Sequence, residues 1–267
     1  MRPLKFHPIL KQTLWGGERI IPYKELASGL SRVGESWELS GMPGSESVVA
    51  EGPWAGSTLS ELIGRFGAEL LGKANYARFG QEFPLLVKFI DAREDLSIQV
   101  HPDDELARKR HGKSGKCEMW YVLEAEPGAS LLTGFSRPIA PAEYERRVAD
   151  NTLTDVLNRQ AIASGDVFYL PAGRVHSIGK GSFIVEIQQS SDITYRIYDF
   201  DRRDAAGNSR ELHTELAREA IDFESSENSR ITYAPENNQE VRLVTTPYFT
   251  TSLYTLTCLL YTSPSPR

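Results

Sequence analysis

The sequence of 267 residues contains only two cysteines, Cys117 and Cys258, and neither belongs to a CxxC pair. This scarcity excludes a disulfide framework, argues against thiolate metal ligation, and favours a reducing, cytoplasmic setting. The chain has no apolar run near the roughly 18 residues that span a bilayer. Its first residues contain no apolar signal-peptide region. A formal net charge of -6 argues against nucleic acid or an anionic membrane as the main partner.

What the sequence does contain is many short runs of β-branched and aromatic residues, separated by Gly, Pro, Asn and Asp. Short strands at this spacing favour a β-sandwich or a barrel. The length suffices for one large domain or two modest ones with a full core. The predicted strands cover residues 36–39, 84–90, 96–100, 119–123, 130–133, 166–170 and 182–188.

Helical patterns interrupt these strands in three places. Ser57 and Thr58 are candidate N-caps, and the apolar residues after them recur at helical spacing. Pro141 suits the first turn of a second helical region. Helical insertions are therefore predicted near residues 57–80 and 141–158, with a short charged helix over residues 103–110.

The most informative motif is the strand over residues 166–170, which runs into Pro171-Ala172-Gly173 and then His176. Proline and glycine set a tight turn, and the chain then enters another strand. This arrangement would hold the imidazole of His176 on stiff backbone at the mouth of a β-barrel.

A set of partners for this histidine lies upstream. Gln99 and His101 are two residues apart in a strand pattern, so their side chains point to one face. Glu118 opens a later strand. Two histidines, a carboxylate and an amide suit a divalent metal, with zinc favoured and iron or manganese as alternatives.

Each of these residues also has an ordinary structural explanation. A lone strand histidine is often only hydrogen-bonded, and Glu118 could form a surface ion pair with Lys116 or Arg110. The spacing of the set favours the metal site. The remaining histidines, His7, His111 and His213, lie outside the pattern and are expected at the surface.

The spacing from Gly165 through Pro171-x-Gly173 to His176 resembles the second signature motif of the cupin superfamily, with Lys180 where asparagine is usual. Gln99-x-His101, with a stretched interval to Glu118, resembles one cupin branch, the type I mannose-6-phosphate isomerases. The resemblance runs from about residue 3 to 256. It includes Leu14-Trp15-Gly16-Gly17, Gly34-Glu35-Ser36-Trp37-Glu38, Phe83-Pro84-Leu85-Leu86-Val87-Lys88 and Ser97-Ile98-Gln99-Val100-His101-Pro102-Asp103-Asp104.

The resemblance implies a mainly β fold, a cupin-type jelly-roll barrel with helical insertions that is followed in the family by a second, smaller jelly-roll. We therefore expect a catalytic cupin domain over residues 1–235. Residues 236–267 are expected to be the start of a truncated C-terminal β domain, with a non-native tail from about residue 258.

The resemblance also implies a function, the interconversion of mannose 6-phosphate and fructose 6-phosphate through a cis-enediolate. It assigns one zinc ion per chain, and Arg196 matches the family's active-site arginine. The residues that match the family's zinc ligands are Gln99, His101, Glu118 and His176.

The chemistry of a sugar phosphate also needs a cationic anchor and a base. Arg196 could grip phosphate oxygens, and Lys116, on the same strand face as Glu118, is a candidate for phosphate contact or proton transfer. Ser97 could donate to the phosphate. Asp192, four residues before Arg196, could orient that arginine or transfer a proton. The base stays open among His101, Lys116, Asp192 and a hydroxide on the metal.

Two other function classes compete with the isomerase. One is an iron-dependent cupin oxygenase, and the other is a non-catalytic sugar-binding cupin. Arg196 could also be paired to Glu186 or Asp199 without a catalytic part. The sequence leaves the oligomeric state open.

Overall fold

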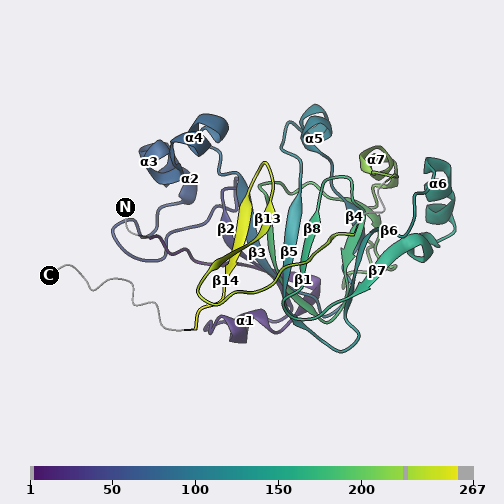
Figure 1. The fold of residues 1–267 in the computed structure, drawn as a ribbon. Coiled ribbons are helices and arrows are strands. Elements are labelled where there is room, and N and C mark those ends of the chain that lie inside the picture. The colour runs from purple at the N-terminus through teal and green to yellow at the C-terminus, as the bar shows by residue number, and fades with distance from the viewer. Residues whose placement is uncertain (1–2, 225–227, 258–267) are drawn as a thin grey trace.

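Seven antiparallel strands form the larger of two main sheets (Figure 1). The protein is described here by a computed structural model over residues 3–224 and 228–257. In spatial order the strands are β1 (Ile9–Gly17), β2 (Val33–Ser40), β3 (Leu85–Asp91), β10 (Ser182–Gln189), β5 (Glu118–Ala125), β8 (Val167–Leu170) and β12 (Arg230–Ile231). The strands follow the β-branched and aromatic runs because such side chains pack well on a pleated, half-buried surface.

A second sheet of five antiparallel strands packs against the first. Its order is β11 (Tyr195–Tyr198), β4 (Ile98–Val100), β9 (His176–Ile178), β6 (Ser130–Phe135) and β7 (Leu157–Ala161). Trp120, Phe168 and Ile184 of the larger sheet share one buried cluster with Leu131 and Ile178 of the smaller sheet. This packing confirms the predicted mainly β, cupin-type class. In the described residues the two sheets stay separate and do not close into one continuous barrel.

Helices lie at the ends and edges of this sandwich, and α5 stands above the strands (Figure 1). Thr58 begins α2 with a reciprocal capping box to Glu61, and Pro141 is the first residue of α6. The helices are α1 (Ile20–Tyr23), α2 (Leu59–Phe66), α3 (Ala68–Leu71), α4 (Lys73–Phe79), α5 (Asp104–His111), α6 (Pro141–Ala149), α7 (Thr214–Ala220) and the 3-10 helix η1 (Leu153–Val156). Each of the three predicted helical regions therefore contains helix.

The strands β13 (Glu240–Thr245) and β14 (Thr250–Tyr254) form a separate two-stranded sheet. Leu243, Val244 and Phe249 of this hairpin region share a buried cluster with Met119 of the larger sheet and with Cys117, which directly precedes β5. The hairpin therefore covers the outer face of that sheet. The domain boundary predicted at residue 235 stays a prediction, and the predicted tail from residue 258 lies outside the described residues.

The sequence predicts no disulfide framework and no membrane-spanning segment. Cys117 is buried and forms no disulfide, whereas Cys258 lies outside the described residues. Within residues 3–224 and 228–257, no helix combines the length and the apolar character needed to cross a bilayer.

Candidate metal centre and its cavity

His101, Glu118 and His176 converge in the interior of the sandwich. Their candidate ligand atoms all lie within 4.8 Å of one another, and each residue is at most 2% exposed. His101 directly follows β4, Glu118 opens β5 and His176 opens β9, so three strand ends from two sheets supply the cluster. The cross-strand pairing of Gln99 with His176 fixes β4 beside β9.

The turn before His176 is built as the sequence indicates. Gly173 has φ +86°, which a residue with a side chain rarely adopts, and an added Cβ would lie 3.1 Å from the carbonyl oxygen of Ala220. The N–H of Gly173 donates to the carbonyl of His101 at 2.9 Å. This hydrogen bond ties the turn that carries one histidine to the backbone of the other.

The two imidazoles present their Nε2 atoms to the interior of the cluster. Nδ1 of His101 donates to the carbonyl of Ile193 at 2.8 Å, and Nδ1 of His176 donates to the carbonyl of Arg174 at 2.8 Å. Because a carbonyl can only accept, these bonds place the proton of a neutral ring on Nδ1. Burial, together with the Lys116 ammonium, lowers the pKa of His101 to about 4, so this ring is neutral near pH 7.

Glu118 supplies a buried, charged acceptor whose ion-pair partner is the Lys116 ammonium. Nζ of Lys116 lies 2.8 Å from Glu118 Oε2, yet neither carboxylate oxygen accepts a hydrogen bond from the described residues. His176 Nε2 lies 3.3 Å from Oε1, and His101 Nε2 lies 3.5 Å from Oε2. Burial alone would raise the pKa of Glu118, but Lys116 and the histidines hold it well below its usual value.

These contacts test whether a metal fits. Two imidazole lone pairs face a buried carboxylate, and such acceptors repel one another unless cations lie among them. The Lys116 ammonium contacts His101 Nε2 and Glu118 Oε2, whereas His176 Nε2 faces Glu118 Oε1 directly at 3.3 Å. Two neutral imidazoles and one carboxylate are a donor set that suits zinc, iron or manganese. The residues therefore fit a divalent cation.

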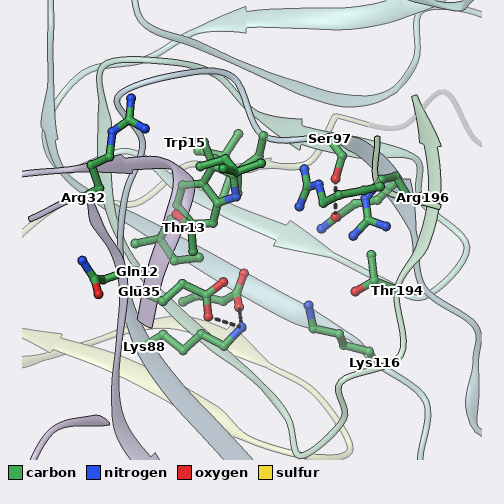
Figure 2. A pocket seen from close by; sticks show the side chains of 17 residues that line it. Gln12, Thr13, Trp15, Arg32, Glu35, Lys88, Ser97, Lys116, Thr194 and Arg196 are labelled. Carbon is green, nitrogen blue, oxygen red and sulfur yellow. Dashed lines mark hydrogen bonds and ion pairs between the residues drawn. The ribbon is translucent and has the colours of Figure 1, made fainter. Parts of the chain in front are cut away.

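A cavity of about 620 Å³ adjoins the cluster. Gln99 and Lys116 line it and also touch the cluster, because Gln99 Nε2 is 3.4 Å from His176 Nε2 and Lys116 Nζ is 3.0 Å from His101 Nε2. Figure 2 shows Lys116, Ser97 and Arg196 on one side of the cavity, with Lys88 and Glu35 across from them.

Gln99, the fourth predicted metal ligand, presents its amide nitrogen to His176. Its Oε1 accepts a hydrogen bond from the Ser97 hydroxyl at 3.2 Å. Ser97 is buried and lines the cavity. An exchange of the amide oxygen and nitrogen by rotation about the terminal bond would be needed for Gln99 to ligate through oxygen.

Arg196 lines the cavity, and not all of its guanidinium donors are used in hydrogen bonds. One terminal nitrogen donates to the carbonyl of Glu211 at 2.9 Å, whereas Nε is buried and has no hydrogen-bond partner in the described part of the chain. Burial and the neighbouring Arg210 lower the pKa of Arg196. His213, expected at the surface, is instead half-buried, and its Nδ1 accepts the Arg196 N–H at 3.2 Å.

Glu186 and Asp199, which the sequence offered as ion-pair partners of Arg196, bind other basic residues instead. Glu186 pairs with Lys88 at 2.9 Å. Asp199 accepts from Arg210 Nε at 2.7 Å and from Arg202 at 3.2 Å.

Asp192 is the one predicted site residue that lies neither in the buried cluster nor among the residues that line the cavity. Its side chain is 50% exposed and pairs with Lys113 at 2.8 Å. It precedes β11 in a loop, where a spacing of four residues from Arg196 fixes no common direction.

Sequence reasoning missed the opposite wall of the cavity. Lys88 and Glu186 are both buried there, and Trp120 Nε1 donates to the second Glu186 oxygen at 3.0 Å. Burial opposes the charge of Lys88, but Glu186 and Glu35 raise its pKa above the usual value. Lys88 and Glu186 face each other across β3 and β10. That register depends on long-range pairing, so only the lysine at the end of the Phe-Pro-Leu-Leu-Val-Lys motif could have indicated it.

Comparisons with known proteins extend these observations. Residues 4–134 match the family model of the catalytic domain of phosphomannose isomerase type I. The probable mannose-6-phosphate isomerase GmuF of Bacillus subtilis is 39% identical over 220 residues, which cover 82% of this chain and 68% of that protein. The chain belongs to the type I phosphomannose isomerase family.

Two further relatives agree with this assignment. The mannose-6-phosphate isomerase of Streptococcus mutans is 37% identical over 93% of this chain and 77% of its own length. The crystal structure of the mannose 6-phosphate isomerase of Bacillus subtilis superposes with a TM-score of 0.85 at 33% identity, over 94% of this chain and 79% of that one. The predicted family is therefore confirmed, and the His101, Glu118 and His176 cluster matches the metal dependence of the type I family.

Proposed function

We propose that this chain is a zinc-dependent aldose–ketose isomerase that interconverts mannose 6-phosphate and fructose 6-phosphate. The observation that carries this proposal is a buried His101, Glu118 and His176 cluster beside a cavity of about 620 Å³. A chain of the type I phosphomannose isomerase family with this cluster has both the lineage and the donor set for that reaction.

Zinc is the proposed cofactor, one ion per chain, held by His101, Glu118 and His176 with Gln99 as a fourth ligand through its amide oxygen. The tautomers of both histidines support this assignment, because their backbone hydrogen bonds place the ring proton on Nδ1 and direct the Nε2 lone pairs into the cluster. When bound, zinc would polarise the substrate carbonyl and stabilise the charge that develops in the cis-enediolate.

The remaining steps belong to cavity side chains. Arg196 would bind the phosphate, since its buried Nε has no hydrogen-bond partner among the described residues and guanidinium matches anionic oxygens. Ser97 would add a hydroxyl donor.

Lys116 is our candidate for moving the proton between C2 and C1, because its side-chain nitrogen lines the cavity and lies 3.0 Å from His101 Nε2. As the free amine it would accept the proton from C2, and the ammonium group so formed would return that proton to C1. His101 stays the alternative. The exposed position of Asp192 argues against a role for its carboxylate in proton transfer.

Two coarser assignments accompany the mechanism. Residues 1–235 are proposed as the catalytic unit and residue 236 as the start of a further β domain, because β13 and β14 pair only with each other among the described strands. A cytoplasmic location is also proposed.

A coupled assay of mannose 6-phosphate conversion tests the proposal. The purified protein is assayed as prepared, after chelation, and after zinc or iron is restored to the chelated sample. Activity that disappears on chelation and returns with zinc supports the isomerase. A folded, zinc-loaded protein without turnover would favour the sugar-binding cupin. Iron as the only effective metal, with oxygen consumption, would favour the oxygenase.

A further inference from the structure

The strand that carries Glu118 has an outer face as well as the inner one. Lys116 and Glu118 point inward to the candidate metal centre, and their side chains form an ion pair there. Cys117 and Met119 instead pack in a separate hydrophobic group with Leu243 of the hairpin. Alternation along a strand requires this division. A contact on the outer face can therefore set the position of the inner side chains without touching them.

Three consecutive peptide N–H groups beside the cavity are each held from outside. The N–H of Gly115 donates to Oδ1 of Asp104 at 2.8 Å. The N–H of Lys116 donates to the carbonyl of Pro102 at 3.1 Å. The N–H of Cys117 donates to Oε1 of Gln189 at 2.8 Å. The backbone on both sides of Lys116 is thus fixed by side chains that do not line the cavity.

Asp104 connects these supports to one another. Its Oδ1 also accepts from Nε2 of Gln189 at 3.0 Å, and its Oδ2 accepts from the Tyr248 hydroxyl at 2.7 Å. Three donors therefore converge on one carboxylate, which accepts them best when ionised. The backbone N–H of Gln189 donates to the carbonyl of Cys117 at 3.1 Å, so Gln189 holds that residue at both its N–H and its C=O.

Tyr248 reaches Asp104 from the turn between β13 and β14. Oγ1 of Thr246 accepts the N–H groups of Tyr248 and Phe249, each at 3.0 Å, and this fixes the turn. The hydrogen-bonded chain Tyr248–Asp104–Gln189 therefore runs from the hairpin to the segment of residues 115–117 that leads into β5.

We propose that Asp104, held by Tyr248, is a positioning residue that sets Lys116 and Glu118 for metal binding and proton transfer. This inference rests on the proposed function but concerns residues that touch neither the cluster nor the cavity. The hairpin then contributes to the site although none of its side chains lines the cavity.

The test compares three variants of the whole chain. Asp104→Ala removes the acceptor of three hydrogen bonds, and Tyr248→Phe removes one donor while keeping the ring. Asp103→Ala is the matched control, because Asp103 caps the same helix through the N–H of Leu106 and makes no side-chain hydrogen bond to residues 115–117. The readouts are zinc affinity by competition with a chelator, amide hydrogen exchange over residues 115–117, melting temperature, and kcat and KM.

We expect Asp104→Ala to weaken zinc affinity and to lower kcat about tenfold, with faster exchange of the Gly115 and Cys117 amides. Tyr248→Phe should show a smaller change in the same direction. Asp103→Ala should lower the melting temperature while zinc affinity and kcat stay within about twofold of the wild type.

Equal zinc affinity and amide exchange in Asp104→Ala and Asp103→Ala would overturn the inference. If Asp104→Ala does not fold, Tyr248→Phe decides, and unchanged zinc affinity in that variant also overturns it. Zinc affinity and exchange are measured without substrate. A wild-type protein that binds zinc without isomerase activity therefore contradicts the proposed reaction and leaves the positioning role to be judged separately.

Discussion

Glu118→Gln is the sharpest perturbation of the candidate metal centre, because it keeps the side-chain shape and removes only the charge of a fully buried carboxylate. Zinc at 100 times its dissociation constant stabilises a folded protein by about 2.7 kcal/mol. At roughly 2–4 °C per kcal/mol for a protein of this size, the wild-type melting temperature should rise by about 5–10 °C. Loss of an outer-shell partner already weakens metal binding about 10- to 100-fold, so loss of a direct ligand should weaken it at least about 100-fold.

At the same zinc concentration, the ion would then stabilise the variant by at most about 0.4 kcal/mol, which corresponds to a shift of roughly 1 °C. The assay is thermal unfolding with and without zinc, so each protein serves as its own baseline. Glu124→Gln is the matched control, because Glu124 is an exposed residue of the same strand, and it should keep the full shift. A shift above about 5 °C in Glu118→Gln would refute the assignment of this carboxylate as a ligand.

Three further substitutions test a proposed metal ligand, the arginine proposed to bind the phosphate, and the glycine turn before His176. His176→Ala should lose both bound metal and turnover, as measured by elemental analysis and the coupled assay; stoichiometric zinc in this variant would contradict the ligand assignment. Arg196→Ala should retain zinc but abolish turnover, because the variant loses the buried Nε donor proposed to bind the phosphate. A near-normal kcat/KM would exclude this role of Arg196. Gly173→Ala should lower the free energy of unfolding by about 1–3 kcal/mol, since φ is +86° and the new Cβ would lie 3.1 Å from the Ala220 carbonyl. Chemical denaturation measures that cost, and wild-type stability would show that the turn relaxes freely.

Local patterns in the sequence anticipated much of the fold. The β-branched run before Pro171 becomes β8, and Thr58 begins α2 with the expected cap. Such features depend on neighbours within a few residues, which the sequence displays directly. The face-to-face arrangement of separate sheets depends instead on which strands pair over long distances, and no local pattern encodes that pairing.

The same distinction applies to the candidate site. The alternation of Gln99 with His101 and of Lys116 with Glu118 indicated shared strand faces, and the structure brings these residues to one cavity and cluster. Asp192 does not join these residues, because it lies in a loop, where side-chain direction has no fixed period. The Lys88–Glu186 pair escaped notice because only the register of β3 against β10 brings the two charges together.

The burial of the cluster has a consequence for how metal is exchanged. With His101, Glu118 and His176 each at most 2% exposed, and with Gln99 and Lys116 both lining the cavity and touching the cluster, the cavity offers the approach to the cluster. Substrate and metal would then share one entrance. A sugar phosphate bound in that entrance would slow both the dissociation of the metal ion and the access of a chelator. Bound substrate would therefore protect the metal from loss during turnover.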